Sequence, residues 1–312
     1  MSTPVREELA TLDATAQAEL VRSGELTPAE LVEAAIERIE AIDSELNSVI
    51  QAFFDEARAE AAGELPDGPF RGVPFLLKDL GVSFAGQPYH MGMRVLKEMG
   101  FRAPVDAFLA LRFREAGLVT LGKTNTPELG IVPTTEPVAY GPTRNPWDTA
   151  RSAGGSSGGA GAAVAAGLVP FAHASDGGGS IRIPASHNGL VGLKTTRART
   201  TMGPLVGDFA SGLSENFAVT RSVRDAAALL DAVHGSAPGD PYAAPTPSRP
   251  FAEELTADPG SLRISVLRTS AVEADPTPEA IAAVDSAVSL LAELGHDVEE
   301  LDLGAMAIGE DM

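Results

Sequence analysis

The chain has 312 residues, of which 44% are hydrophobic, and this length can bury one large core or two smaller ones. It contains no cysteine, which excludes a disulfide scaffold, a thiol nucleophile and a cysteine-ligated metal. Its formal net charge of −20 argues against nucleic acid or an anionic membrane as a partner, because both require a cationic protein surface.

The N-terminal residues MSTPVREELATL carry acidic side chains and lack the apolar core of a signal peptide. The longest apolar run, residues 162–174, is broken by Gly167 and Pro170 and is too short to span a bilayer. The sequence therefore predicts a cytoplasmic protein without a membrane partner.

In the first half of the chain, helical and strand patterns alternate. Thr27-Pro28-Ala29-Glu30 forms a capping box with proline at the first helical position, and the apolar residues that follow have helical spacing, so we expect a helical segment over residues 1–62. A short buried strand is expected over 72–77, ending at Lys78, and an amphipathic helix over 106–117 precedes a strand over 118–121. This order indicates α/β layering.

The second half continues the same alternation. We expect a helix of small residues over 158–167, a strand over 190–193, a helix over 222–235, a surface connection over 240–259, a strand over 262–267, a helix over 278–294 and a strand over 298–301. The chain then stops directly after a strand, whereas an α/β sheet normally continues into a covering helix. We therefore expect that part of the fold is missing.

Two short motifs have conventional interpretations that their surroundings disfavour. Residues 117–124 match the phosphate-loop pattern GxxxxGK[ST], but a helix precedes them and their interior is an apolar strand. Residues 154–158 match the GxSxG elbow, which would make Ser156 a nucleophile served by His234 or His296. The polar, proline-broken segment before them is not the buried strand that an elbow needs.

A third group of residues points to lysine as the base. A neutral amine can activate a hydroxyl when burial lowers its pKa, and Lys78 ends the apolar run VPFLL. Asp176-Gly177-Gly178-Gly179-Ser180 places a serine after three glycines, so that backbone N–H groups can converge on one point, as an oxyanion requires. The apolar flanks LVPFAHA and IRIP of this loop are interpreted as strands.

Residues 154–185 resemble the signature segment of the amidase signature family, serine hydrolases with a Ser, cis-Ser, Lys triad. The resemblance rests on GGSSGG, a small-residue helix, D-x-GGSIR-x-PA and the upstream G-V-P-x-x-x-K-D, with support from LGKTNTPELG and TRNPW. It extends over about residues 13–303 and is greatest to the bacterial hydrolases of cyclic amide dimers in nylon-oligomer degradation. It implies a single domain over 1–312, with a mixed β-sheet covered by helices on both faces.

The resemblance also implies roles for individual residues. Ser180 would be the acylating nucleophile, Ser156 the relay serine on a cis peptide bond after Gly155, and Lys78 the base. The family uses no metal or other cofactor, and its substrate is a small-molecule amide.

Further roles surround this triad. The family pattern implies an oxyanion hole made by the backbone N–H groups of Gly177, Gly178, Gly179 and Ser180. Ser157 and Asp176 would support the network by hydrogen bonding, and Arg182 would hold the loop.

Because family members continue well beyond residue 312, the resemblance implies that the C-terminal part of the family fold is missing here. Amide hydrolysis is the function that it favours. The glutaminase subunit of a tRNA-dependent amidotransferase and an inactive truncated remnant remain alternatives, and a homodimer is left open.

Overall fold

The computed structural model describes residues 8–268 and 275–301. The chain divides into two compact units, Met1–Leu255 and Thr256–Met312. The single domain expected over 1–312 stays a prediction. The expected stop of the chain directly after a strand involves residues 302–312, which lie outside the described residues.

The N-terminal segment is helical with one interruption. It forms α2 (Ala14–Arg22), α3 (Pro28–Leu46) and α4 (Phe54–Ala62), and the capping box of Thr27 and Glu30 is confirmed. The prediction of helix throughout was wrong at β1 (Val49–Ala52), which pairs antiparallel with another strand. Its β-branched residues Val49 and Ile50 favour an extended backbone, and the strand forms its backbone hydrogen bonds in the sheet rather than in a helix.

The first unit contains a six-stranded mixed sheet. Its strands, in spatial order, are β1, β3 (Val119–Thr124), β2 (Pro74–Lys78), β6 (Phe171–Asp176), β8 (Glu215–Thr220) and β7 (Val191–Gly192). The three central strands β3, β2 and β6 are parallel, and the outer pairings are antiparallel. β3 includes Lys123 within the strand, so the phosphate-loop interpretation of residues 117–124 was wrong.

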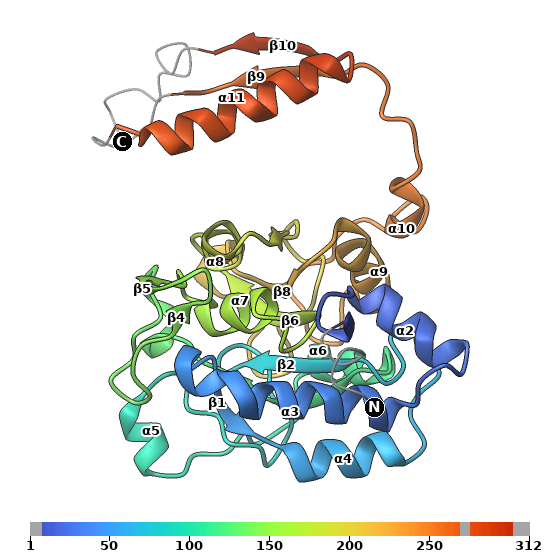
Figure 1. Ribbon diagram of the computed structural model, residues 1–312, viewed down its shortest axis with the longest axis vertical. Coiled ribbons are helices and arrows are strands. Elements are labelled where there is room, and N and C mark those ends of the chain that lie inside the picture. Colours follow the sequence, from blue (N-terminus) through green and yellow to red (C-terminus); the bar gives the residue numbers. More distant parts are fainter. Residues whose placement is uncertain (1–7, 269–274, 302–312) are drawn as a thin grey trace. The chain divides into compact units, whose positions relative to one another are not determined.

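Helices cover both faces of this sheet, as expected. α3 and α7 (Gly158–Ala165) contact each other and pack against the central strands β2 and β3 (Figure 1). On the opposite face, α6 (Phe108–Glu115) contacts α9 (Val223–Val233), and the ring of Phe113 packs on Phe75 of β2 at a centroid distance of 4.8 Å. The apolar core lies between these layers.

Shorter elements connect the layers. They are α5 (Arg94–Glu98), β4 (Arg144–Asn145), β5 (Asp148–Ser152), α8 (Arg182–Asn188), α10 (Phe251–Glu254) and the 3₁₀ turns Glu128–Gly130 and Ala210–Gly212. The interpretation of IRIP as a strand was wrong, because α8 begins at Arg182. The hydrogen bond from the Ile183 N–H to Gly179 O, at 2.7 Å, turns the chain from the glycine loop into this helix.

The second unit has a simpler pattern. It contains β9 (Arg263–Val266), α11 (Pro278–Glu293) and β10 (Asp297–Glu300), and the two strands pair in parallel. These elements confirm the strands and the helix expected after residue 260. They form a β-α-β unit, the connection that parallel strands require.

Candidate active site

Lys78 is the centre of the candidate site. It lies at the end of β2, and its side chain is fully buried. Its Nζ lies 2.7 Å from Ser156 Oγ and 2.9 Å from Ser175 Oγ. Figure 1 shows β2 next to β6, which contains Ser175, and α7, which begins shortly after Ser156. The amine therefore has two hydroxyl partners.

Burial strongly disfavours the charged form of this lysine. Desolvation lowers the pKa of Lys78 to about 7, although the negative charge of Asp176 acts in the opposite direction. Near neutral pH, a large fraction of the amine is therefore uncharged and able to accept a proton.

Ser156 is held by the turn that precedes α7. The peptide bond between Gly155 and Ser156 is cis, as the resemblance implies. A side chain at Gly155 would collide with the backbone, since a Cβ there would lie 2.4 Å from Thr134 O. Glycine is therefore required at this position.

The two histidines considered for the elbow interpretation have other contacts. The His234 ring packs on Phe251 at a centroid distance of 5.6 Å, and His296 accepts a hydrogen bond from the Leu262 N–H within the second unit. The hydroxyl of Ser156 has Lys78 as its partner instead. This geometry favours a lysine base over a histidine base.

Ser180 and the glycine loop lie beside the turn that carries Ser156. The Ser157 N–H donates to Ser180 O at 3.3 Å, which ties the two segments together. In the described part of the chain, the backbone N–H groups of Gly177, Gly178 and Ser180 have no hydrogen-bond acceptor. The Gly179 N–H differs, because it donates to Asp176 Oδ1 at 2.6 Å and is not available to an oxyanion in this arrangement.

Asp176 and Arg182 fix the shape of the loop. Arg182 forms a bidentate pair with Asp176, with Nε 2.8 Å from Oδ2 and Nη2 3.0 Å from Oδ1. The Asp176 carboxylate is buried, and its hydrogen bonds with Arg182 and with backbone N–H groups lower its pKa despite desolvation. The carboxylate therefore stays charged and holds both ends of the loop.

Ser175 is a contact of Lys78 that sequence patterns did not identify. It lies on β6 directly before Asp176, and Ser157 bridges its backbone: Ser157 Oγ lies 3.2 Å from Ser175 O and 3.3 Å from Ser175 N. Which strand residue faces Lys78 depends on the relation between β2 and β6, which a single sequence does not give. The only signal for Ser175 in the sequence was its place directly before Asp176, after a segment expected to be a strand.

A cavity of about 470 Å³ opens over the site. Its lining includes the hydroxyl residues Ser156, Ser175, Ser180 and Ser214. The rest is mainly apolar and is made by Leu80, Leu129, Gly130, Ile131, Val132, Pro133, Gly177, Gly178, Ile183, Phe209 and Ala210. No ionisable side chain is among these lining residues.

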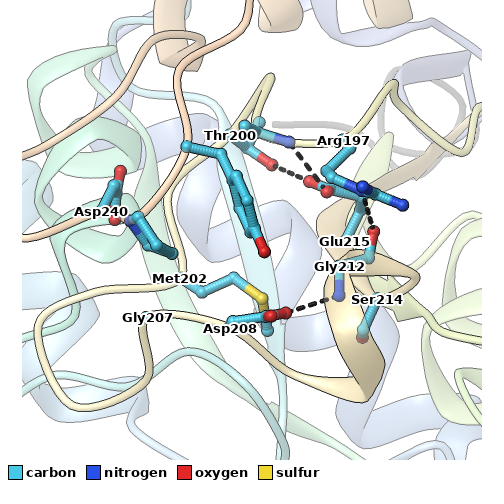
Figure 2. A pocket seen from close by; sticks show the side chains of 12 residues that line it. Arg197, Thr200, Met202, Gly207, Asp208, Gly212, Ser214, Glu215 and Asp240 are labelled. Carbon is cyan, nitrogen blue, oxygen red and sulfur yellow. Dashed lines mark hydrogen bonds between the residues drawn. The ribbon is translucent and has the colours of Figure 1, made fainter.

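A small polar pocket lies next to this cavity and shares Ser214 with it. Figure 2 shows two hydrogen bonds among its lining residues: Arg197 Nε donates to Gly212 O at 2.9 Å, and the Gly212 N–H donates to Asp208 Oδ1 at 2.5 Å. Its volume is only about 20 Å³. These contacts stabilise the loop that carries Phe209 and Ala210 to the wall of the larger cavity.

A second buried lysine supports the segment after Lys78. Lys123 Nζ lies 2.7 Å from Ser83 Oγ and 4.0 Å from Asp79 Oδ1, and burial lowers the pKa of Lys123 to about 8. Asp79 also accepts a hydrogen bond from the His90 N–H at 3.0 Å. These contacts link the residue after Lys78 to β3.

Two other kinds of feature are absent from the described residues. No helix in these ranges combines the length and the apolar character needed to cross a membrane. No cluster of three or more acidic or histidine side chains there is suited to hold a metal ion.

The fold and this site define a family. The Amidase family model matches residues 30–311, and the chain belongs to the amidase signature family. The chain is 54% identical, over 291 residues, to the 6-aminohexanoate-cyclic-dimer hydrolase of Paenarthrobacter ureafaciens, an alignment that covers 92% of this chain and 59% of that enzyme.

Solved structures agree with this assignment. The structure of 6-aminohexanoate cyclic dimer hydrolase complexed with substrate is 52% identical and has a TM-score of 0.90, covering 94% of this chain and 61% of that one. A component of the glutamyl-tRNA(Gln) amidotransferase from Thermotoga maritima is 30% identical with a TM-score of 0.80, covering 94% of this chain and 62% of that one. The chain thus spans about three fifths of the length of these relatives.

Proposed function

We propose that this protein hydrolyses uncharged amides through an acyl-enzyme on Ser180, with Ser156 and Lys78 as the proton relay. The observation that carries the proposal is the 2.7 Å contact between the buried Lys78 Nζ and Ser156 Oγ, beside a cavity that Ser180 also lines. A neutral amine, a hydroxyl and a second hydroxyl at a cavity wall are the parts that nucleophilic catalysis needs.

In the first half-reaction, Ser180 Oγ attacks the amide carbonyl carbon and loses its proton to Ser156 Oγ, whose own proton passes to neutral Lys78. The tetrahedral oxyanion accepts hydrogen bonds from the N–H groups of Gly177, Gly178 and Ser180. The relay then runs in reverse and protonates the leaving nitrogen as the C–N bond breaks, because an amide nitrogen leaves poorly without a proton.

In the second half-reaction, water attacks the ester carbonyl of the acyl-enzyme. Its proton returns through Ser156 to Lys78 and is delivered to Ser180 Oγ as the ester bond breaks. The products are a carboxylic acid and an amine, and the enzyme regains its starting protonation state.

The lining of the cavity supports an uncharged, largely aliphatic substrate. Without an ionisable lining side chain, a charged substrate would lose its hydration with no ion-pair partner to compensate. The relative at 54% identity is named for hydrolysis of the cyclic dimer of 6-aminohexanoate, an amide of this kind, and we extend that substrate class to this chain.

The test is to measure turnover of three amides by the purified chain: benzamide, the cyclic dimer of 6-aminohexanoate, and glutamine. We expect turnover of the neutral amides, and a loss of about 10³-fold or more in kcat for Ser180→Ala. Ser186→Ala, which changes an exposed serine on α8, is the matched control and should retain activity.

Other outcomes would favour the alternatives. Glutamine hydrolysis that appears only with a partner protein would favour a glutaminase role within an amidotransferase, the kind of assembly for which the Thermotoga maritima relative is named. A folded chain that turns over none of the three amides would favour an inactive remnant.

A further inference from the structure

The backbone of Lys78 pairs with a neighbouring strand on one side only. β2 pairs with β3 along its whole length, up to Lys78 opposite Thr124, but it pairs with β6 only at Leu76 opposite Ala172. Beyond that point the β2–β6 ladder stops, although β6 continues to pair with β8 as far as Asp176. The N–H of Lys78 therefore needs an acceptor other than a strand carbonyl.

A histidine side chain supplies this acceptor. His173 lies on β6, is fully buried, and places Nδ1 3.2 Å from the Lys78 backbone N. Its Nε2 lies 3.3 Å from Asn216 Oδ1, on the neighbouring strand β8. The imidazole thus spans from β2 to β8 across the place where the ladder is interrupted.

These partners fix the tautomer of the ring. The backbone N–H of Lys78 can only donate, so Nδ1 must be the unprotonated nitrogen. A neutral ring then carries its proton on Nε2, where the side-chain oxygen of Asn216 accepts it. Phe113 packs on the ring at a centroid distance of 5.9 Å.

Protonation of this ring is strongly disfavoured. Burial, followed by the nearby charge of Lys78, lowers the pKa of His173 to about 3. The acceptor at Nδ1 therefore persists throughout the neutral and mildly acidic range.

We propose that His173 is a positioning residue for Lys78: its Nδ1 replaces the missing ladder acceptor and holds the Lys78 backbone where the amine reaches Ser156 and Ser175. The inference rests on the proposed function, since it assigns His173 a role in catalysis through the base Lys78. His173 does not line the cavity and takes no part in proton transfer.

The kinetic test compares two substitutions of His173 with a neutral amide as substrate. His173→Leu removes the acceptor, whereas His173→Asn restores an oxygen at the position of Nδ1, because both atoms are bonded to Cγ. We expect His173→Leu to lower kcat about 10- to 100-fold with little change in KM, since a small displacement of a catalytic group has an effect of this size. His173→Asn should recover most of kcat.

Val233→Ala is the control for lost stability, because it removes buried volume from α9 without altering an acceptor near Lys78. It should destabilise the fold and leave kcat unchanged. The proposal is overturned if folded His173→Leu has the kcat of the unsubstituted chain, or if His173→Asn is as impaired as His173→Leu.

A second measurement does not depend on activity. The chain has only four lysines and five histidines, so Lys78 and His173 can be assigned by NMR after selective isotope labelling. We expect the nitrogen shifts of His173 to show a proton on Nε2 and none on Nδ1, and the Lys78 backbone amide to exchange faster in His173→Leu than in His173→Asn. A proton on Nδ1, or equal exchange in the two variants, overturns the proposal.

The two measurements separate the two claims. If the chain is inactive but the expected tautomer and exchange difference are found, the proposed function fails and the structural role of His173 stands. If the chain is active but insensitive to His173→Leu, the proposed function stands and the positioning role fails.

Discussion

At Lys78, the protonation state of the amine depends on its removal from water. The side chain is buried, and its two hydroxyl contacts, Ser156 and Ser175, accept or donate hydrogen bonds without carrying charge. The negative charge of Asp176 favours the charged form of the Lys78 amine, but the Asp176 carboxylate is already paired with Arg182. Desolvation therefore decides the protonation state.

This predicts the pH dependence of the reaction. Since only the neutral amine accepts a proton, and the pKa of Lys78 is lowered to about 7, kcat/KM for a non-ionising amide should rise as the pH increases through about 7 and then level off. The measurement is a pH–rate profile over the range in which the chain stays folded. A rise centred near the ordinary lysine pKa of about 10.4 would contradict the account.

At the scale of elements, the site depends on the close approach of two turns. The segment that carries Gly155 and Ser156 passes directly over the backbone of Thr134, and α7 begins two residues after Ser156. The small residues of α7 are buried and allow the helix to lie close to the strands.

Gly155→Ala tests this approach. A methyl group 2.4 Å from Thr134 O forces the turn to move, so we expect a loss of about 1–3 kcal/mol in the free energy of unfolding, together with reduced kcat. Urea unfolding and activity assays give both values. Gly63→Ala is the matched control, because a Cβ there lies 3.4 Å from its nearest neighbour, an ordinary contact. Equal behaviour of the two variants would contradict the close-packing argument.

Elements with a strong local signal could be predicted from the sequence. The capping box at Thr27, the apolar run that ends at Lys78 and the small-residue helix after Ser157 all have a local cause and occur as expected. The strand β1 and the helix α8 were missed because each is short and its state depends on tertiary pairing or on the preceding glycine loop.

In the candidate site too, residues marked by a sequence motif were predicted, and residues brought in by tertiary pairing were not. Lys78, Ser156 and Ser180 were predicted through motifs, and the contact between the first two occurs as those motifs imply. Ser175, Lys123 and His173 were not predicted, since their importance comes from which strand lies beside which and in what register.

At the scale of the whole molecule, the site is contained in one of the two units. The hydroxyl partners of the Lys78 amine lie within Met1–Leu255, and the buried apolar core of the described residues ends at Val233. The second unit contributes its own β-α-β pattern.

We therefore expect a chain that ends at Leu255 to fold by itself. It should show a cooperative thermal transition, because it keeps the six-stranded sheet and the helices on both of its faces. Circular dichroism during heating is the measurement, with the 312-residue chain as the reference. A shortened chain without a cooperative transition would show that the first unit depends on residues after 255.

The proposed role of Ser180 as the nucleophile is tested by locating the residue that becomes covalently acylated. The chain is mixed with p-nitrophenyl butyrate and quenched in acid, and the modified residue is then mapped by peptide mass spectrometry. We expect one butyryl group on Ser180, absent in Ser180→Ala and formed much more slowly in Lys78→Ala. Acylation of Ser156 in place of Ser180, or no acylation of a chain shown to be folded, would contradict it.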